Sequence, residues 1–211
     1  MTFDQAWLAD GWSETETLAL APTGVSDEFA RRIFDTAAPI PPVISEKAWG
    51  AQPPNARQQE HRYPLWAQPY VGVRRAYQPR LAFNNERVDE TVTLDWAGTF
   101  RAARGYTFDD PARAGRLNVD DQLRPWLTTM LAAGRDILTE YGAHGDLRLV
   151  YQLDLQSRGI WFESVPGGGS FDPERVLTVE LDTTFGDDET RPVDHVLAEL
   201  LRAVGHGPRD V

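Results

Sequence analysis

Two long stretches of the chain repeat apolar residues with the period of an α-helix. Apolar residues form one stripe from about residue 122 to residue 141, and Gly142 follows where a left-handed residue often ends a helix. The second stretch begins near Pro192 and has helical spacing throughout, with Val193, Val196, Leu197, Leu200, Leu201 and Val204. A shorter helix is predicted for residues 26–35, with Ser26 as its N-cap. We therefore expect three helices that each bury one face.

Other segments alternate apolar and polar residues, which is typical of a β-strand with one buried face. Residues 71–77 and 91–96 are predicted to form a hairpin, because Asn84 and Asn85 between them tolerate the positive φ of a turn. Residues 147–155, 160–165 and 176–182 are predicted to form a meander of three strands. The pattern thus indicates five strands that pair with their neighbours in sequence.

The predicted order of elements is helix, two strands, helix, three strands, helix. It indicates an α+β fold, arranged as a two-layer sandwich of a mainly antiparallel sheet with helices packed on one face. We expect one domain over residues 1–211, with residues 1–25 as an irregular N-terminal arm and residues 39–69 as a proline-rich loop. This order resembles that of small profilin-like and roadblock-like domains. The last third resembles regions that follow DNA-binding domains in actinobacterial regulatory proteins.

Composition narrows the classes of function. The chain has no cysteine, so it has no disulfide, zinc–thiolate site or iron–sulfur cluster. No run of about 18 apolar residues occurs, and the first residues are acidic where a secretory signal would be basic. The net charge of −11 opposes binding to phosphates and anionic lipids. We expect a cytoplasmic protein that binds neither membranes nor nucleic acid.

The charge is unevenly distributed along the chain. Residues 57–104 contain 8 Arg and 5 acidic residues, a net of +3, whereas residues 106–211 contain 10 Arg and 19 acidic residues, a net of −9. The basic segment also holds aromatic residues, which offer flat surfaces for stacking beside guanidinium groups. We predict a ligand- or partner-binding surface made by Trp66, Tyr70, Arg74, Arg75, Tyr77 and Arg80. The alternative is that these arginines pair with the acidic C-terminal half while the aromatics lie in the core.

Signatures of catalysis and of bound metal are weak. The acidic loop at residues 182–189 offers carboxylates that Ca²⁺ or Mg²⁺ prefer, but its spacing differs from a calcium-binding loop and it equally suits the start of the following helix. The four histidines include no metal-binding pair, although His61 could present a base from the proline-rich loop. The glycine-rich loop at residues 167–169 lacks the residues of a phosphate-binding loop. We predict no catalytic residue, no metal and no cofactor.

Three classes of function remain open. The first is a protein-binding module of an immunity-type, regulatory or scaffold kind, without catalytic activity, whose acidic surface docks another protein and favours a basic one. The second is a small-molecule sensor, or an enzyme with dispersed residues, whose site lies near residues 52–80. The third is a structural subunit of a larger assembly, which includes a homo-oligomer.

Overall fold

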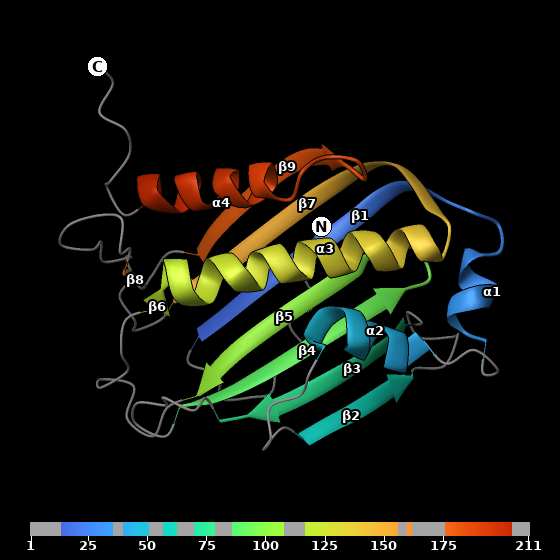
Figure 1. Ribbon diagram of the computed structural model, residues 1–211, viewed down its shortest axis with the longest axis horizontal. Helices are drawn as coiled ribbons and strands as arrows, with labels where there is room; N and C mark the ends of the chain where they lie inside the picture. The colour runs from blue at the N-terminus through green and yellow to red at the C-terminus, as the bar shows by residue number, and fades with distance from the viewer. Residues whose placement is uncertain are drawn as a thin grey trace.

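Seven antiparallel strands form one twisted sheet, in the order β2-β3-β4-β5-β1-β7-β9 (Figure 1). The computed structural model describes residues 14–35, 40–50, 57–62, 70–78, 86–107, 117–155, 160–161 and 176–203. The strands are β1 (Glu14–Val25), β2 (Arg57–Arg62), β3 (Tyr70–Tyr77), β4 (Arg87–Asp95), β5 (Phe100–Thr107), β7 (Ala143–Leu155) and β9 (Val176–Thr184). Two short strands, β6 (Leu117–Asn118) and β8 (Ile160–Trp161), pair in parallel as a separate sheet.

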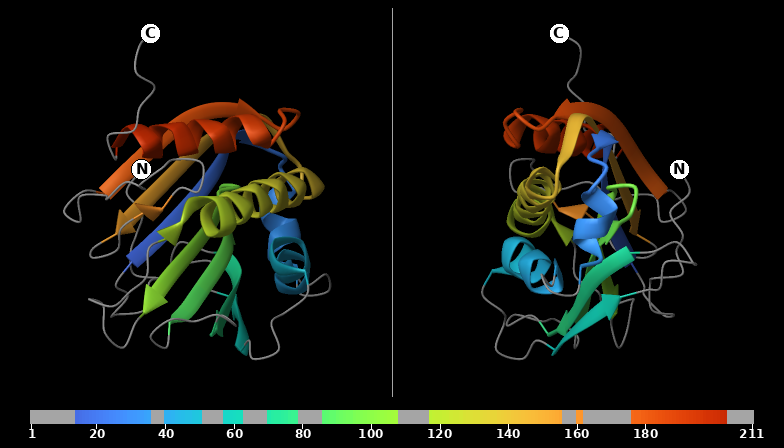
Figure 2. Two further views of the ribbon diagram at one scale, coloured as in Figure 1. Left: turned by 60° about the vertical axis from the view of Figure 1, so that its left-hand side comes forward. Right: turned by 90° about the vertical axis from the view of Figure 1, so that its right-hand side faces the viewer.

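Three helices lie over the same face of the sheet, as the two views of Figure 2 show. They are α2 (Ile40–Trp49), α3 (Arg124–Glu140) and α4 (Thr190–Ala203), and a shorter helix, α1 (Phe29–Ile33), follows β1. A π-helical turn over Val119–Leu123 leads into α3. The core between this face and the helices contains the fully buried side chains Leu18, Leu20, Ile44, Phe100, Leu94, Ile137 and Tyr151. The sheet and helices therefore form an α+β fold with a mainly antiparallel sheet, as predicted.

The predicted elements with the most regular patterns are present. The hairpin of β3 and β4 is antiparallel, and β7 and β9 are antiparallel neighbours. Helix α3 carries Pro125 in its first turn, where no N–H is needed, and Gly142 after it has a φ of 93°. Helix α4 buries Val193, Val196, Leu197 and Leu200. No helix among the described segments is long and apolar enough to cross a membrane.

Two segments predicted to be irregular are ordered elements instead. Residues 14–25, within the predicted N-terminal arm, form β1, which pairs with both β5 and β7 and lies inside the sheet. The predicted proline-rich loop contains α2 and β2. Pro41 and Pro42 occupy the first turn of α2, where their missing N–H groups break no helical hydrogen bond. Prolines therefore mark the beginning of a helix here rather than a loop.

Three further predictions need correction. Strand β5 was absent from the predicted order, although it pairs with β1 and β4 at the middle of the sheet. Strand β8 pairs with β6 rather than with β7, so β7 and β9 are neighbours without a third strand between them. Helix α1 begins later than expected, at Phe29, and no side chain caps it. Ser26 instead accepts the backbone N–H of Phe29 at its carbonyl oxygen, 2.9 Å away.

Candidate functional site

Strand β3 divides the predicted binding residues between the two faces of the sheet. Arg75 and Tyr77 point toward the helices, because side chains alternate along a strand and Val73, two positions earlier, is in the core. Arg74 is on the opposite face, where its guanidinium group binds Asp89 on β4 at 2.9 Å. Tyr70 shares that opposite face by the same alternation. Trp66 and Arg80 lie outside the described residues, so the structure brings together two of the six predicted residues.

Four charged residues of alternating sign form a row across the face of the sheet that the helices cover. Arg75 on β3 is directly opposite Glu90 on β4, Glu90 is directly opposite Arg104 on β5, and Arg104 is directly opposite Glu16 on β1. We call these four residues the charge row. Direct cross-strand partners lie close enough for opposite charges to attract. The antiparallel register thus places each charge beside one or two of opposite sign.

The β1 end of the charge row is deeply buried. The carboxylate of Glu16 has no exposed surface and accepts two hydrogen bonds from Nη2 of Arg104, at 2.8 Å and 3.0 Å. It also accepts the hydroxyl hydrogen of Tyr106, with an O–O distance of 2.9 Å. Nη2 of Arg104 donates as well to the carbonyl oxygen of Gln122, at 3.2 Å, which ties the row to the residues that precede α3. A buried pair of this kind keeps its charges because hydrogen bonds replace the lost water.

The β3 end of the charge row is held in the same manner. Nε of Arg75 donates to Glu90 at 2.5 Å, and both side chains are largely buried. Tyr77 also forms a side-chain hydrogen bond with Glu90. The expectation that Arg74 and Arg75 pair with the acidic C-terminal half is therefore wrong, because both pair with acids on the neighbouring strand β4. The cross-strand register, which depends on tertiary structure, selects these partners.

Aromatic rings flank both arginines of the charge row. The guanidinium carbon of Arg75 lies 4.6 Å from the ring centre of Trp49 on α2 and 5.1 Å from that of Tyr77. The guanidinium carbon of Arg104 lies 4.9 Å from the ring centre of Trp126 on α3 and 5.3 Å from that of Tyr106. A cation over an aromatic face is attracted by the ring electrons. Each arginine is thus fixed by one or two carboxylates and two rings.

A cleft of about 400 Å³ opens above three members of the charge row, Arg75, Glu90 and Arg104. Its floor comes from β3, β4 and β5, and its walls come from α2 and from the start of α3. The lining includes both arginines, four aromatic side chains and polar groups from three elements: Trp49, Arg75, Tyr77, Glu86, Glu90, Arg104, Tyr106, Asp121, Gln122, Trp126 and Thr129. Its volume lies toward the lower end of the range for small-molecule sites, which runs from roughly 300 to 1,000 Å³.

The terminal nitrogens of the two arginines are the donors of this cleft. Among the described residues, neither Nη atom of Arg75 makes a hydrogen bond, because Glu90 engages Nε alone. Nη1 of Arg104 likewise makes none within the described part of the chain, since Glu16 and Gln122 engage Nη2. None of these three atoms is among the buried polar atoms without a partner. Two rigid cations in the floor of the cleft therefore keep three terminal nitrogens without a hydrogen-bond partner among the described residues.

The pKa values of the tyrosines around the charge row oppose acid–base catalysis at neutral pH. Burial, followed by the charge of Glu90, raises the pKa of Tyr77 to about 12. Burial also raises the pKa of Tyr151, with a further contribution from the charge of Glu16. Burial alone would lower the pKa of Arg104, but the charges of Glu16, Tyr106 and Glu90 outweigh it and raise that pKa. These side chains stay protonated near pH 7, so they hold and orient rather than transfer protons.

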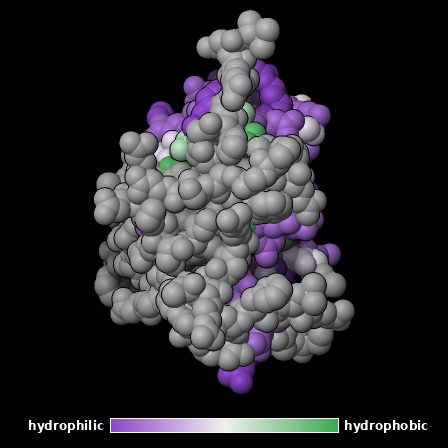
Figure 3. Space-filling model, turned by 90° about the vertical axis from the view of Figure 1, so that its left-hand side faces the viewer, coloured by the Kyte–Doolittle hydropathy of each residue, from purple (hydrophilic) through white to green (hydrophobic). Residues whose placement is uncertain are grey.

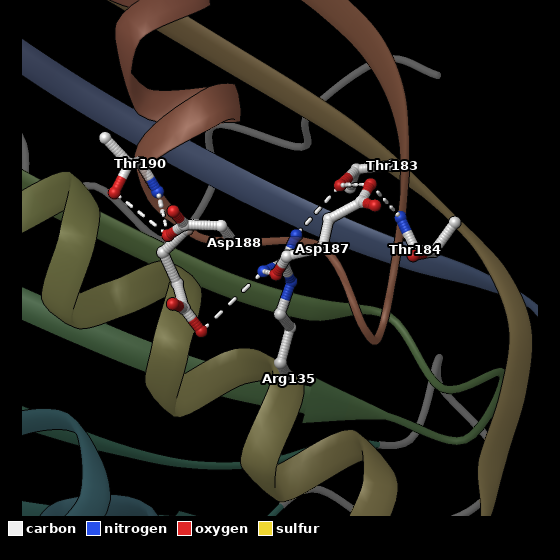
Figure 4. Close-up of polar contacts among 7 residues, drawn as sticks. Arg135, Thr183, Thr184, Asp187, Asp188 and Thr190 are labelled. Atoms are coloured by element: carbon white, nitrogen blue, oxygen red, sulfur yellow. Dashed lines mark hydrogen bonds and ion pairs between the residues drawn. The ribbon is translucent and has the colours of Figure 1, made fainter.

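The acidic loop that joins β9 to α4 serves the fold. Figure 4 shows Arg135 of α3 beside Thr183 and Asp187, and its Nη2 donates to the hydroxyl of Thr183 at 2.8 Å. The carboxylate of Asp187 accepts from that hydroxyl and from the backbone of Thr184, both at 2.9 Å. These bonds lower the pKa of Asp187. The loop thus fastens the end of β9 to α3.

The next carboxylate of this loop caps α4. Asp188 accepts from the backbone N–H and the hydroxyl of Thr190, at 3.0 Å and 2.9 Å, and these bonds lower its pKa. A carboxylate there also meets the positive end of the helix dipole. In the described segments, no group of three or more His, Asp or Glu residues could hold a metal ion. His195 is exposed beside Glu199, and His144 is exposed in β7, where its Nδ1 lies 3.4 Å from the carbonyl oxygen of Gly142, so neither residue lines the cleft.

Sequence reasoning missed most of the site. Glu16, Glu90, Arg104, Trp49 and Trp126 were not singled out, although they complete the environment of Arg75 and Tyr77. The sequence did hold a signal for the three charged residues, Glu16, Glu90 and Arg104. Each lies at two-residue spacing from the buried apolar residues of its strand, and so on the buried face. Glu16, for example, precedes Leu18 and Leu20 at two-residue spacing in the buried face of β1. A charged residue in an apolar phase is unusual unless it is paired, and that anomaly points to a buried network.

Comparisons with known proteins do not identify this site. No family model, no curated protein and no solved structure matches the chain. Seen from the left-hand side of Figure 1, the visible described surface is mostly hydrophilic, with a small hydrophobic area near α4 (Figure 3). The resemblances of element order rested on a strand order that lacked β1, β2 and β5, so they carry no argument. Function must therefore be inferred from the geometry of the cleft.

Proposed function

We propose that this protein is a non-catalytic binding protein that holds a small molecule in the cleft over the charge row. The observation that carries the proposal is the pair of rigid arginines, Arg75 and Arg104, whose terminal nitrogens line the cleft without a hydrogen-bond partner in the described residues. Groups that are fixed before binding lose little conformational entropy when a ligand arrives. Convergent polar groups within an aromatic-lined cleft are typical of ligand sites.

Binding without catalysis is favoured by the side chains of the cleft. Its described lining contains no His, Ser or Cys, and Thr129 is the one hydroxyl of a nucleophilic type there. Tyr77 keeps its proton at neutral pH because its pKa is raised to about 12. Glu90 already accepts hydrogen bonds from Arg75 and Tyr77. Among the described residues, the lining therefore has no Ser or Cys nucleophile beside a histidine, which is one common arrangement for covalent catalysis.

A thermal-shift experiment tests the proposal. The protein would be incubated with a small-molecule extract of its host cells, and the midpoint of thermal unfolding compared with that of protein in buffer. A ligand at 100 times its dissociation constant stabilises by about 2.7 kcal/mol, which raises the midpoint of a chain this size by about 5 to 10 °C. Arg75→Met should lose this increase relative to its own baseline. The matched control, Arg148→Met, removes an exposed arginine elsewhere on the sheet and should keep it. An increase that is equal in both variants would place the ligand outside the cleft.

A second candidate function is the docking of a basic protein. The observation that favours it is the charge of residues 176–203, which include seven acidic residues and two arginines. Several of these carboxylates are exposed, among them Glu180, Asp182 and Asp194. An acidic surface accelerates association with basic partners, and salt weakens the effect. The third class, a structural subunit, stays a prediction.

Charge reversal tests this second candidate. Asp182→Lys places the change on β9, and Asp27→Lys makes the same change in net charge on an exposed residue before α1. Each variant and the wild type would be used to capture basic proteins from a host lysate at two salt concentrations. Docking on the acidic surface predicts a partner that Asp182→Lys loses, that Asp27→Lys keeps and that high salt releases. Equal loss in both variants would mean that net charge alone governs the capture.

A further inference from the structure

The electrostatics of the cleft indicate the charge of its ligand. The charge row has two positive and two negative members, and the register sets them side by side in the order Arg75, Glu90, Arg104, Glu16. Of these four residues, Arg75, Glu90 and Arg104 line the cleft, so a bound group meets two positive charges and one negative charge of the row. Glu86 and Asp121 add two carboxylates to the lining. An anion would be opposed by these carboxylates, and a cation would be opposed by the arginine nitrogens that face it.

The hydrogen-bonding groups of the cleft indicate what the ligand must offer. Three terminal nitrogens, two on Arg75 and one on Arg104, are donors without a partner among the described residues. Arginine has no acceptor atom, so every bond that these nitrogens make to a ligand needs an acceptor on the ligand. Hydrogen bonds from charged donors are the stronger ones. The ligand must therefore carry at least two acceptor atoms, such as carbonyl oxygens or ring nitrogens.

The shape of the lining indicates a flat ligand. Trp49 from α2 and Trp126 from α3 stand on the helical walls, while Tyr77 and Tyr106 come from the strands of the floor. The planar guanidinium groups of Arg75 and Arg104 stack on these rings at 4.6–5.3 Å. Each ring already has a guanidinium group over it, so a planar ligand would make dispersion contacts with the parts of these flat groups that border the cleft. A cleft of about 400 Å³ has room for one or two rings.

We infer that the cleft takes an uncharged, planar molecule with two or more hydrogen-bond acceptors, of the class of amide-bearing heterocycles. This inference rests on the proposed function, because it names the ligand class of the same cleft. The acceptors of the ligand bind the terminal nitrogens of Arg75 and Arg104, and its ring packs among the aromatic side chains. The carboxylates of the charge row hold the arginines in place and are not themselves contacted.

Fractionation of the host extract tests the charge of the ligand. The extract that raises the unfolding midpoint would be passed at pH 7 through an anion exchanger and through a cation exchanger. The inference predicts that the stabilising component passes through both columns and absorbs ultraviolet light, as a conjugated ring does. Retention on either column would overturn the ligand class but leave the proposed function intact. An extract that stabilises no sample would overturn the proposed function and the inference with it.

A set of defined probes tests the same point without the extract. Nicotinamide, nicotinate and 3-(aminomethyl)pyridine share one ring and differ in charge, and their binding would be measured by saturation-transfer NMR. The inference predicts the strongest signal for nicotinamide. Arg75→Met should weaken its binding by about tenfold or more, because the variant removes hydrogen bonds from a charged donor, whereas Arg148→Met should leave it unchanged. A preference for nicotinate or for the amine, or an equal signal from Arg75→Met, would overturn the inference.

Discussion

Replacement of Glu16 by glutamine removes one charge from the most buried part of the charge row. The side chain of Glu16 has no exposed surface, and that of Arg104, its partner, is 8% exposed. Glutamine has nearly the same shape and keeps one oxygen that can accept from Arg104 or Tyr106. The substitution therefore tests the charge rather than the packing. It leaves the guanidinium group of Arg104 with Glu90, which already binds Arg75.

The expected loss of stability in Glu16→Gln is large. Removal of one partner from a buried ion pair costs about 3 to 5 kcal/mol, because the remaining charge has neither water nor a full counter-charge. Domains have unfolding free energies of about 5 to 15 kcal/mol, so this single atom change removes a large share of the total. Glu16 accepts two hydrogen bonds from Arg104 and one from Tyr106, which supports an effect in the upper part of this range.

Urea denaturation measures this loss, as the change in midpoint multiplied by the slope. Glu180→Gln is the matched control, because Glu180 and Arg148 form an ion pair between β7 and β9 of the same sheet with both side chains about half exposed. Exposed pairs contribute little, so the control should lose a small part of what Glu16→Gln loses. Equal losses in the two variants would refute the claim that burial makes the charge row important for stability.

A double substitution separates charge from packing. Glu16→Leu combined with Arg104→Met replaces the buried pair by apolar side chains of similar size. Such replacements are often neutral or stabilising, because no charge must be desolvated. The double variant should therefore unfold at a higher urea concentration than Glu16→Gln. A double variant that is less stable than Glu16→Gln would mean that the hydrogen bonds, rather than the unpaired charge, dominate.

Three further substitutions test other parts of the account. The pKa of Tyr77 is raised from 10.0 to about 12 in the folded protein. As the pH rises from 10 to 12, the tyrosine therefore loses its proton in the unfolded chain before it does in the folded protein, and the free energy of unfolding of the wild type falls. Tyr77→Phe should lose less stability over that range, by at most about 1.4 kcal/mol per pH unit, in urea titrations at several pH values. Gly134→Ala would place a Cβ 2.6 Å from Leu20 and 2.8 Å from Phe100. This crowding should lower the free energy of unfolding, measured in urea, by about 1 to 2 kcal/mol, although alanine has the better helix propensity. A variant that is more stable than the wild type would contradict this packing. Asp188→Ala removes the cap of α4 and should unfold at lower urea than the wild type at pH 7, with the difference shrinking as the pH falls toward the lowered pKa of Asp188.

The sequence predicted the elements whose amphipathic pattern is undisturbed, and it also predicted β3 and β4. It missed β1, β2 and β5 of the sheet and helix α2, which begins with prolines. Strands β7 and β9 and helices α3 and α4 place apolar residues at regular spacing, so their period alone identified them. Strand β1 was missed because Glu16 occupies its buried phase. Strand β5 has the same property through Arg104. Strand β2 has six polar residues, and it joins the sheet through backbone pairing with β3, which no side-chain pattern reports.

The candidate site was predicted in part for similar physical reasons. The shared face of Arg75 and Tyr77 follows from alternation along one strand, which is a local property. Their partners come from other elements, namely Glu90 on β4 and Trp49 on α2. Cross-strand register and helix docking set these contacts, and a single sequence specifies neither of them by spacing. The stacking of arginine on tryptophan, 26 positions apart in the chain, is the clearest instance.

Native mass spectrometry of protein purified gently from its host tests the central claim most directly. The claim predicts that part of the wild-type protein carries an added small mass, which denaturation removes. Arg75→Met should lack this mass and Arg148→Met should keep it. A bare mass in all three proteins under conditions that preserve the fold would contradict the claim that the cleft holds a small molecule. An added protein mass with no added small-molecule mass would also contradict this claim, and it would favour the docking of a partner protein instead.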